Sequence, residues 1–477
     1  MERYDNYIGG EWVGGDYRPN ISPSDVDDIV GEYAQGTADD VAAATAAARE
    51  AFESWSVATP QQRFDVLDAA GTQILRRRDE LARLLAREEG KPLAEAAAEV
   101  GRAGQIFKFF AGEAVRLTGD VVASVRPGMT VEVTREPLGV IGLITPWNFP
   151  IAIPAWKMAP ALAFGNAVVI KPAELVPSCT WELVRILEDS GLPGGVLNLV
   201  MGRGSVVGEA IIASPDVTAV SFTGSAQVGR QVAVRCAESG KRVQTEMGGK
   251  NPMVVLDDAD LPTAVEACVN GAYFSTGQRC TASSRLIVTA GIHDRFVEAV
   301  QERMRGLRVG HALDHDTVIG PVVDQRQLDQ DLEYIAVAAA EGGKVVGGER
   351  VRGRTEGFYL APALVTGTSN DMRINREEVF GPLASVVRVP DYDAALEAVN
   401  DTEFGLSAGI CSTSLKRVAH FKRHARAGMV MVNAPTAGVD YHVPFGGSKA
   451  SSYGPREQGS YAREFYTIVK TAYVNPG

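Results

Sequence analysis

The segment Gly139-Val140-Ile141-Gly142-Leu143-Ile144-Thr145-Pro146-Trp147-Asn148-Phe149-Pro150 indicates the fold of this chain. It is a short β-branched run followed by a rigid loop with two prolines. Similar apolar runs follow at 167–170, 196–200 and 218–222, and helical patterns alternate with them. This alternation is the signature of a parallel sheet with crossover helices, so an α/β fold is expected.

A second α/β series follows Gly248 and Gly249, where the two units are expected to join. Its candidate strands are residues 253–256, 284–288, 384–389 and 429–432.

Two segments do not fit this alternation. Residues 121–126 and 130–134 flank Pro127-Gly128 and are expected to form a hairpin, and residues 466–474 a late strand at the C-terminus. An isolated hairpin is only marginally stable, so it should pair with another segment. The tail of a neighbouring subunit is a plausible partner, which predicts an oligomer.

The composition is that of a globular protein. With 477 residues, 45% of them hydrophobic, the chain is long enough for two or three domains. A net charge of −12 argues against binding to nucleic acid or anionic membranes, because phosphate contacts need clustered Lys and Arg. The compact basic run 76–78 lies within a helical pattern over 61–89 and is expected on a solvated face.

The cysteines and the apolar segments predict the compartment. Five cysteines without a CxxC pair indicate a reducing environment. The N-terminus lacks the apolar core of a signal peptide, and the most apolar stretch, 151–170, is broken by two prolines and a lysine. We therefore expect a soluble cytoplasmic protein with no membrane partner.

Cys280 is the main candidate nucleophile. It follows the turn-forming, donor-rich segment 274–279 and precedes the apolar run 286–288. A thiol attacks as a thiolate, and at an ordinary pKa of about 8.5 only a few per cent is ionised at neutral pH, so nearby donors or a base are needed. The other four cysteines are expected to be buried as small hydrophobic residues. Burial is also the alternative for Cys280.

A carboxylate and an amide could assist this thiol. Glu246 precedes two glycines, which would let substrate or cofactor pass close to the backbone. As a general base it would activate the thiol, or the water that hydrolyses a thioester. Asn148 follows the strand 140–144, where ligands bind in such sheets, and could donate to an oxyanion. A surface carboxylate and a turn-capping asparagine are the respective alternatives.

The nucleotide-binding patterns are weaker. Residues 202–208 do not match GxGxxG, and residues 224–231 do not match a P-loop. However, the strand 218–222 leads into Thr223-Gly224-Ser225 and a helix, which offers backbone amides and a hydroxyl to a pyrophosphate. Lys171 and Glu174 follow another strand. A carboxylate there could hold a ribose diol and would repel a 2′-phosphate, which favours NAD.

Together these segments resemble the aldehyde dehydrogenase superfamily from end to end. The resemblance starts at residues 8–13 and continues to 377–382 and 444–447. It implies two Rossmann-like α/β domains and an oligomerisation element made of the β-hairpin and the C-terminal strand. The cofactor-binding domain would span 1–117 and 139–247, the catalytic domain 248–455, and the oligomerisation element of a homodimer or homotetramer 118–138 and 456–477.

The resemblance also implies roles for the candidate residues. Cys280 would attack the aldehyde to form a thiohemiacetal, whose oxyanion Asn148 and the Cys280 backbone N–H would stabilise. Hydride would pass to NAD, with NADP as the alternative, and Glu246 would activate water to release the acid from the thioester. No metal is implied.

A cofactor site built from several segments is implied as well. Lys171 and Glu174 would meet the adenosine ribose, Ser225 the pyrophosphate, and Glu378 the nicotinamide ribose. Phe380 would pack near the nicotinamide end. The other implied contacts are Ile144, Thr145, Pro146, Trp147, Gly204, Phe222, Thr223, Gly224 and Val228.

Within the superfamily, residues 277–285, 433–439, 444–449 and 456–459 look most like α-ketoglutaric semialdehyde dehydrogenases, which oxidise 2,5-dioxopentanoate to 2-oxoglutarate. A substrate carboxylate would need a cation, and Arg279 is the candidate anchor unless it points away into a salt bridge. The candidate substrate contacts are Trp156, Arg279, Thr281, Ser283, Val439 and Phe445.

Three other functions remain as alternatives. Succinic semialdehyde or another semialdehyde could be the substrate, although succinic semialdehyde dehydrogenases often have an arginine where this chain has Trp156. A CoA-acylating enzyme would not need Glu246, since it uses CoA in place of activated water. A non-catalytic binding protein of the same fold would not need Cys280, Glu246 and Asn148 together.

Overall fold

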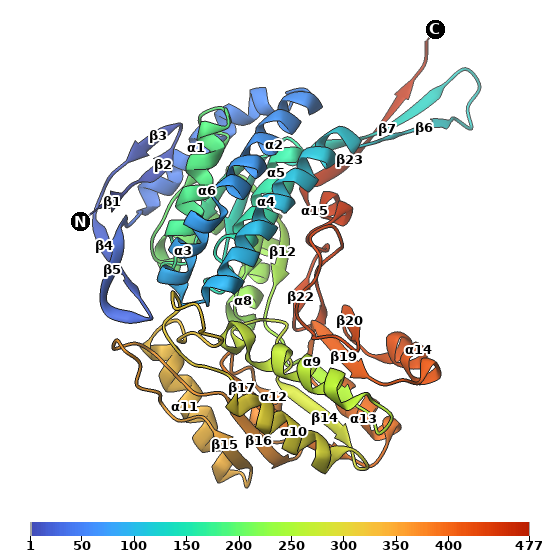
Figure 1. Ribbon diagram of the computed structural model, residues 1–477. Coiled ribbons are helices and arrows are strands. Elements are labelled where there is room, and N and C mark those ends of the chain that lie inside the picture. The colour runs from blue at the N-terminus through green and yellow to red at the C-terminus, as the bar shows by residue number, and fades with distance from the viewer. Residues whose placement is uncertain (1, 477) are drawn as a thin grey trace.

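The computed structural model describes residues 2–476 and contains two large, mainly parallel sheets, each with helices on both faces (Figure 1). The strand order of the first sheet is β22-β12-β11-β8-β9-β10-β2-β3. Five of these strands are parallel: β12 (Arg242–Glu246), β11 (Val217–Thr223), β8 (Val140–Ile144), β9 (Ala167–Lys171) and β10 (Leu197–Leu199). The edges are antiparallel: β22 (Ser452–Tyr453), β2 (Asn6–Ile8) and β3 (Glu11–Val13).

Strand β8 shows why these runs form a central sheet. Ile141 and Leu143 face the cluster of α2, α4, α5 and α6, whereas Val140 and Ile144 face the cluster of α1, α7 and α8. Alternate side chains of a strand point to opposite faces, so a strand covered on both sides must be apolar throughout. The helices are α1 (Ala38–Trp55), α2 (Pro60–Arg76), α3 (Arg78–Glu89), α4 (Leu93–Arg116), α5 (Ala152–Ala163), α6 (Ser178–Asp189), α7 (Glu209–Ala213), which follows the π-turn η1 (Gly204–Gly208), and α8 (Ala226–Glu238).

The single helical pattern expected over 61–89 is instead two helices. Arg77 ends α2 with φ −93° and ψ 16°, and its guanidinium donates to Glu80 and Glu182. These ion pairs fix the position at which α2 ends and α3 begins. The spacing of apolar residues does not reveal this boundary, because both helices pack their apolar face against α4.

The second sheet has the order β15-β16-β17-β14-β13-β19-β20. Helices α9 and α10 cover one face and α13 and α14 the other. Strands β15 and β16 were not expected. The strands are β13 (Pro252–Val255), β14 (Arg285–Thr289), β15 (Lys344–Gly347), β16 (Ala363–Thr368), β17 (Leu383–Val389), β19 (Ser407–Cys411) and β20 (Met429–Val432). The helices are α9 (Leu261–Tyr273), η2 (Phe274–Gly277), α10 (His293–Arg305), α11 (Gln325–Ala340), α12 (Arg373–Arg376), α13 (Tyr392–Asn400) and α14 (Leu415–His424).

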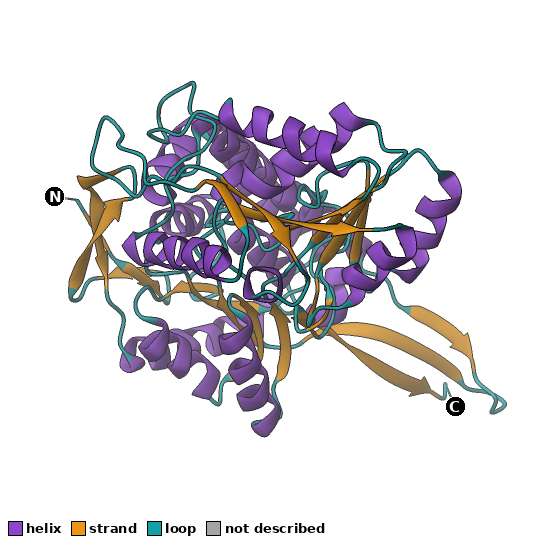
Figure 2. Cartoon of the chain, turned by 90° about the horizontal axis from the view of Figure 1, so that it is seen from below, coloured by secondary structure: helices purple, strands orange, loops and turns teal. Residues whose placement is uncertain are grey.

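The hairpin of β6 (Asp120–Ala123) and β7 (Thr130–Pro137) extends away from the body of the molecule (Figures 1 and 2). Its partner is the tail of the same chain rather than that of a neighbouring subunit. Strand β23 (Thr467–Val474) pairs antiparallel with β7 from Thr467 opposite Pro137 to Val474 opposite Thr130. The hairpin therefore gains its third strand within the chain, through the turns η3 (Ser460–Ala462) and α15 (Arg463–Tyr466).

Smaller elements complete the fold. Strands β1 (Arg3–Tyr4), β5 (Asp25–Ala34) and β4 (Tyr17–Ser22) form a sheet near the N-terminus, and β18 (Phe404–Gly405) pairs with β21 (Ser448–Lys449). Strand β22 lies in the first sheet although residues 452–453 fall in the expected catalytic range, so the chain crosses back at that point. Within residues 2–476, no helix has the length and apolar character needed to cross a membrane.

Candidate active site

Three candidate residues lie where the two large sheets meet. Asn148 follows β8, Glu246 ends β12, and Cys280 lies in the loop between η2 and β14. The Asn148 amide donates from Nδ2 to the carbonyl of Gln278 at 3.0 Å. The charges of Glu378 and Glu246 both act on the Cys280 thiol. The structure thus brings together the thiol, the carboxylate and the amide from segments far apart in sequence.

The nucleophile loop has an unusual backbone. Ser275, Thr276 and Gly277 all adopt left-handed conformations, with φ of 51°, 56° and 65°. A Cβ on Gly277 would lie 2.1 Å from the carbonyl oxygen of Gly381, so glycine is required there. Left-handed conformations are costly for Ser and Thr and persist only when neighbours hold them. Glu95 does so, because it accepts from the backbone N and the Oγ of Ser275, each at 2.9 Å.

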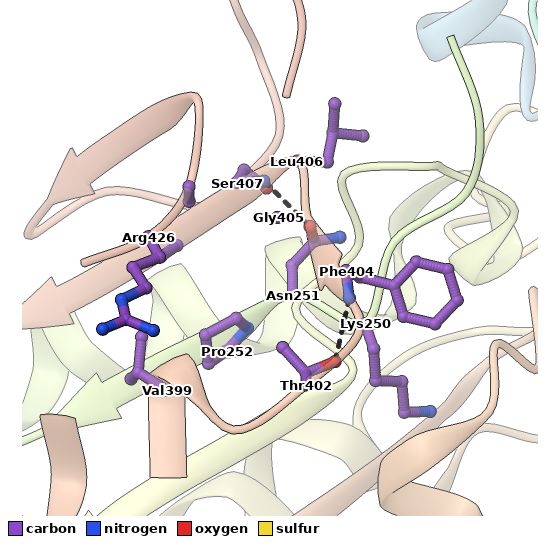
Figure 3. Close-up of a pocket in the computed structure, with 12 residues that line it drawn as sticks. Lys250, Asn251, Pro252, Val399, Thr402, Phe404, Gly405, Leu406, Ser407 and Arg426 are labelled. Atoms are coloured by element: carbon purple, nitrogen blue, oxygen red, sulfur yellow. Dashed lines mark hydrogen bonds between the residues drawn. The ribbon is translucent and has the colours of Figure 1, made fainter. Parts of the chain in front are cut away.

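Asn251 fixes the other side of the loop. Its Nδ2 donates to the carbonyls of Cys280 at 2.7 Å and Ala282 at 3.0 Å, and its Oδ1 accepts from Ser407 N of β19 at 3.0 Å. Figure 3 shows this last bond beside a cavity of about 10 Å³, which is large enough only for a water. The cavity is therefore a packing gap behind the nucleophile and not a substrate site.

Asn148 is held as firmly. It is buried, and its backbone carbonyl accepts from Nζ of Lys91 at 2.8 Å. Lys91 is paired with Glu99 of α4, whose second oxygen accepts from the backbone N of Ile151 and Ala152. A side-chain amide has two N–H groups, so the one not bonded to Gln278 can serve an oxyanion.

Burial shifts the pKa values of two acidic groups in the site. Burial, and then the charge of Glu457, raises the pKa of Glu246 well above its usual range, while Ser452 Oγ donates to its carboxylate at 2.6 Å. Burial, followed by the charges of Glu378 and Glu246, likewise raises the pKa of the Cys280 thiol. Burial thus favours the protonated form of both the thiol and the carboxyl in this arrangement.

The sequence interpretation missed the supporting role of α4. Glu95, Glu99 and Arg102 follow one another at intervals of four and three residues, which places them on one face of the helix. Glu95 holds the nucleophile loop and Glu99 the Asn148 loop. The available signal was the row of charged residues on one face of an otherwise Ala-rich helix. The helical pattern alone does not distinguish such a row from a solvent-exposed face.

The candidate cofactor residues gather at the carboxyl ends of the first sheet. The hydroxyls of Thr145 and Thr223, after β8 and within β11, are buried and have no hydrogen-bond partner among residues 2–476. Ser225 caps α8, because its Oγ accepts from Val228 N at 3.4 Å. Burial lowers the pKa of Lys171 to about 8. Other candidates near this edge are Ile144, which ends β8, Pro146 and Trp147 in the following loop, Gly204, which begins η1, and Phe222, whose ring lies under Gly224.

Two further candidates come from the second α/β unit. Glu378 accepts from Gly249 N at 2.9 Å, and burial raises its pKa to about 7. A Cβ on Gly248 would lie 1.9 Å from the Glu378 carboxylate, which explains the small residue there. Phe380 has φ 67° and packs edge-on against Trp147, with ring centroids 5.4 Å apart. Residues from both units thus meet at one place.

Glu174 lies in the loop between β9 and α6, three residues after Lys171. It is exposed and lines a cavity of about 170 Å³ together with Arg18, Asn20 and Tyr33. Its charge still acts on Lys171, so the two remain neighbours.

The candidate substrate residues divide into two groups. Trp156 and Phe445 pack with ring centroids 5.4 Å apart, and Phe445 belongs to an apolar cluster that Cys280 and Val439 contact. Ser283, by contrast, is fully buried and shares a hydrogen bond with Thr436, which also donates to the carbonyl of Thr281. Ser283 and Thr281 therefore link their loop to the loop of Thr436. The Ser283 hydroxyl and the Thr281 carbonyl are already hydrogen-bonded there.

Arg279 takes the second of its two expected positions. Its guanidinium donates to Glu95 at 3.0 Å and lies 3.4 Å from the carbonyl of Asn270. The salt bridge tightens the same loop that Glu95 holds through Ser275.

We therefore expect Arg279→Ala to lower kcat/KM for acidic and neutral aldehydes alike. Removing one partner of this partly buried pair leaves Glu95 uncompensated and loosens the loop, so kcat/KM should fall about tenfold for both substrates. Steady-state kinetics with an acidic and a neutral aldehyde tests this. A rise in KM confined to the acidic aldehyde would instead place Arg279 in the substrate pocket.

The sequence of this chain, compared with known families, gives one match over most of its length. The model of the aldehyde dehydrogenase family matches residues 12–472. The chain belongs to the aldehyde dehydrogenase family.

Its relatives are similar over nearly their whole length. The chain is 44% identical to an alpha-ketoglutaric semialdehyde dehydrogenase of Bacillus subtilis, with 99% of this chain and 98% of the relative covered. It is 40% identical to a 2,5-dioxopentanoate dehydrogenase of Saccharolobus solfataricus, with 98% of each covered. The crystal structure of an NAD-dependent aldehyde dehydrogenase from Sinorhizobium meliloti superposes with a TM-score of 0.97 at 35% identity, covering 100% of this chain and 95% of that chain.

Proposed function

We propose that this chain oxidises α-ketoglutaric semialdehyde, 2,5-dioxopentanoate, to 2-oxoglutarate, with Cys280 as nucleophile, Glu246 as general base and Asn148 as oxyanion donor. The observation that carries the chemistry is the meeting of these three side chains between the two α/β units. The substrate is supported by the names of relatives at 40% and 44% identity.

The residues at the edge of the first sheet fit a dinucleotide. Buried hydroxyls without partners in the described chain, at Thr145 and Thr223, are donors that a ligand would satisfy. The N-terminus of α8 at Ser225 suits a pyrophosphate, and Lys171 with Glu174 a ribose. Glu378 and Phe380 would border the nicotinamide end. A carboxylate at Glu174 disfavours a 2′-phosphate, so NAD is the proposed cofactor and NADP the alternative.

The chain's own residues account for the remaining steps. The Cys280 thiol gives its proton to the base form of Glu246, which releases it to solvent, and the sulfur bonds to the aldehyde carbon. Asn148 Nδ2 and the Cys280 N–H donate to the oxyanion that forms. A nicotinamide, when bound, would accept the hydride that leaves this carbon, and the thiohemiacetal would thereby be oxidised to a thioester. Glu246 then takes a proton from water as the water attacks the thioester carbon. The C–S bond breaks, the acid leaves, and Glu246 returns its proton to the sulfur, which restores the thiol.

The same proposal covers the organisation of the subunit. Residues 1–117 and 139–247 bind the cofactor, residues 248–455 supply the nucleophile, and residues 118–138 and 456–477 join subunits into a homodimer or homotetramer. The joining is supported by exposed apolar side chains on the protruding sheet, namely Val121, Val122, Ile468, Val469 and Tyr473. Exposed apolar patches of this kind mark interaction surfaces.

A reducing compartment such as the cytoplasm fits the cysteines. All five are free thiols, and four of them are buried. Disulfides are rare in reducing compartments, so the free thiols support this location.

A panel of aldehydes tests the substrate. We expect kcat/KM for 2,5-dioxopentanoate to exceed that for succinic semialdehyde, glutaraldehyde and pentanal by about tenfold or more, because a recognised carboxylate at the right distance contributes at least 1.4 kcal/mol. Reduced nicotinamide absorbance is the measurement, with NAD and NADP compared in parallel. A preference for succinic semialdehyde would move the proposal to the alternative substrate, and product formation that requires CoA would indicate the acylating branch.

A further inference from the structure

A group of hydrogen-bond donors beside the active site has no acceptor. The Nε of Arg102, the Nε2 of Gln458 and the Nε1 of Trp156 are all buried and unpartnered within residues 2–476. Gln458 is fully buried and Trp156 is 6% exposed. Buried polar atoms are almost always satisfied, so three unpaired donors in one place indicate an acceptor that comes from outside the chain.

These donors belong to one built site. Arg102 Nη2 donates to Gln458 Oε1 at 3.0 Å, which orients both the guanidinium and the free amide nitrogen of Gln458. The Arg102 guanidinium carbon lies 5.8 Å from the centroid of the Trp156 ring. Gln458 is held with φ 60°, a left-handed conformation that is costly for a residue other than glycine. Strain of this kind is typical of residues with a positional role.

The site is connected to the nucleophile through aromatic rings. Trp156 packs on Phe445, and Phe445 lies in the apolar cluster that contacts Cys280. A thiolate at Cys280 would also interact electrostatically with the Arg102 guanidinium. A ligand held at Arg102 could therefore reach Cys280 along the rings of Trp156 and Phe445.

Among residues 2–476, no counter-ion is free to neutralise Arg102. The charged groups that act on it are Glu99, Asp440 and Cys280. Glu99 is already engaged by Lys91 and by two backbone N–H groups, and Asp440 is exposed on a loop. No carboxylate of the described chain lies within salt-bridge distance of Arg102, whereas the neighbouring Arg279 is paired with Glu95. A desolvated guanidinium without a partner is unfavourable, and an incoming carboxylate would relieve this cost.

We propose that Arg102, with Gln458 and Trp156, binds the carboxylate of the aldehyde substrate and so determines specificity for semialdehydes that carry an acid. This inference rests on the proposed oxidation of 2,5-dioxopentanoate. The planar guanidinium presents paired N–H donors that match a carboxylate. The apolar rings of Trp156 and Phe445 would enclose the methylene carbons between the carboxylate and the reacting aldehyde.

Substitution of Arg102 tests the site. We expect Arg102→Met to lower kcat/KM for 2,5-dioxopentanoate about 30-fold or more, the size of a lost charge-assisted hydrogen bond, and to change that for pentanal less than threefold. Arg102→Lys keeps the positive charge but lacks the paired N–H donors of the guanidinium. Its kcat/KM for 2,5-dioxopentanoate should lie between those of the wild type and Arg102→Met. Gln458→Asn should lower kcat/KM for 2,5-dioxopentanoate by a smaller factor, again with less change for pentanal. Arg116→Met, at the exposed far end of α4, is the matched control and should leave kcat/KM for both aldehydes unchanged.

Pentanal is the internal check for folding, and inhibition provides a second readout. Glutarate should inhibit pentanal oxidation by the wild type, and Arg102→Met should raise its inhibition constant about 30-fold. An equal loss for both aldehydes, or no loss for either, would overturn the proposal and assign Arg102 a structural role. If the wild type does not prefer 2,5-dioxopentanoate but glutarate inhibition still depends on Arg102, the carboxylate site stands and the proposed substrate fails.

Discussion

Replacing Cys280 by alanine is expected to lower kcat/KM for every aldehyde by at least about 10⁴-fold, the usual scale for loss of a covalent nucleophile. The reason is that no other described thiol is placed to take over. Cys179, Cys236, Cys268 and Cys411 are buried in helices or strands, whereas Cys280 is partly exposed beside Glu246 and Asn148. Formation of reduced nicotinamide, followed over a range of aldehyde concentrations, is the measurement.

Two comparisons make this result specific. Cys236→Ala removes a buried thiol of α8 and should leave the rate nearly unchanged. Binding of NAD to Cys280→Ala, measured by calorimetry, should match the wild type, because none of the proposed cofactor residues is altered. Activity of Cys280→Ala within tenfold of wild type would exclude a thiohemiacetal on this residue.

Glu246→Gln is expected to separate the two halves of the reaction. The variant should release about one equivalent of reduced nicotinamide per active site in a burst and then turn over some 10²–10³-fold more slowly, because the thioester forms but water is no longer activated. Glutamine keeps the shape of the side chain and can still accept from Ser452. Rapid mixing with absorbance detection resolves the burst, and mass spectrometry detects the acylated Cys280.

The pH dependence follows from the same carboxyl group. Burial raises the pKa of Glu246 well above its usual range, and the base form of this carboxyl increases about tenfold per pH unit below that pKa. The wild-type kcat should therefore rise from pH 6 toward alkaline pH when hydrolysis limits turnover. Glu246→Gln should lose this rise in the slow phase. A flat wild-type profile, or a variant without a burst, would argue that Glu246 acts earlier than hydrolysis.

Much of the fold could be predicted from short contiguous segments of the sequence. The apolar run 140–144 forms β8 with the expected bounds, and the hairpin, the late C-terminal strand and the end-to-end aldehyde dehydrogenase resemblance were all recognised from contiguous residues. These features depend on side-chain alternation, turn residues and motifs, which are properties of neighbours in the chain. The break at Arg77 was missed because it depends on ion pairs with Glu80 and Glu182, the latter on α6.

For the site, the sequence by itself determined which chemistry is available, because Cys280, Glu246 and Asn148 lie in short motifs that can be read one at a time. Only the tertiary structure decided the partners of the two arginines. Arg279, adjacent to the nucleophile in sequence, is neutralised by Glu95, whereas Arg102, far away in sequence, lies beside Trp156 and Gln458 without a counter-ion. The charge state and use of an arginine depend on which groups surround it in space, and those groups come from α4, α5 and the C-terminal segment.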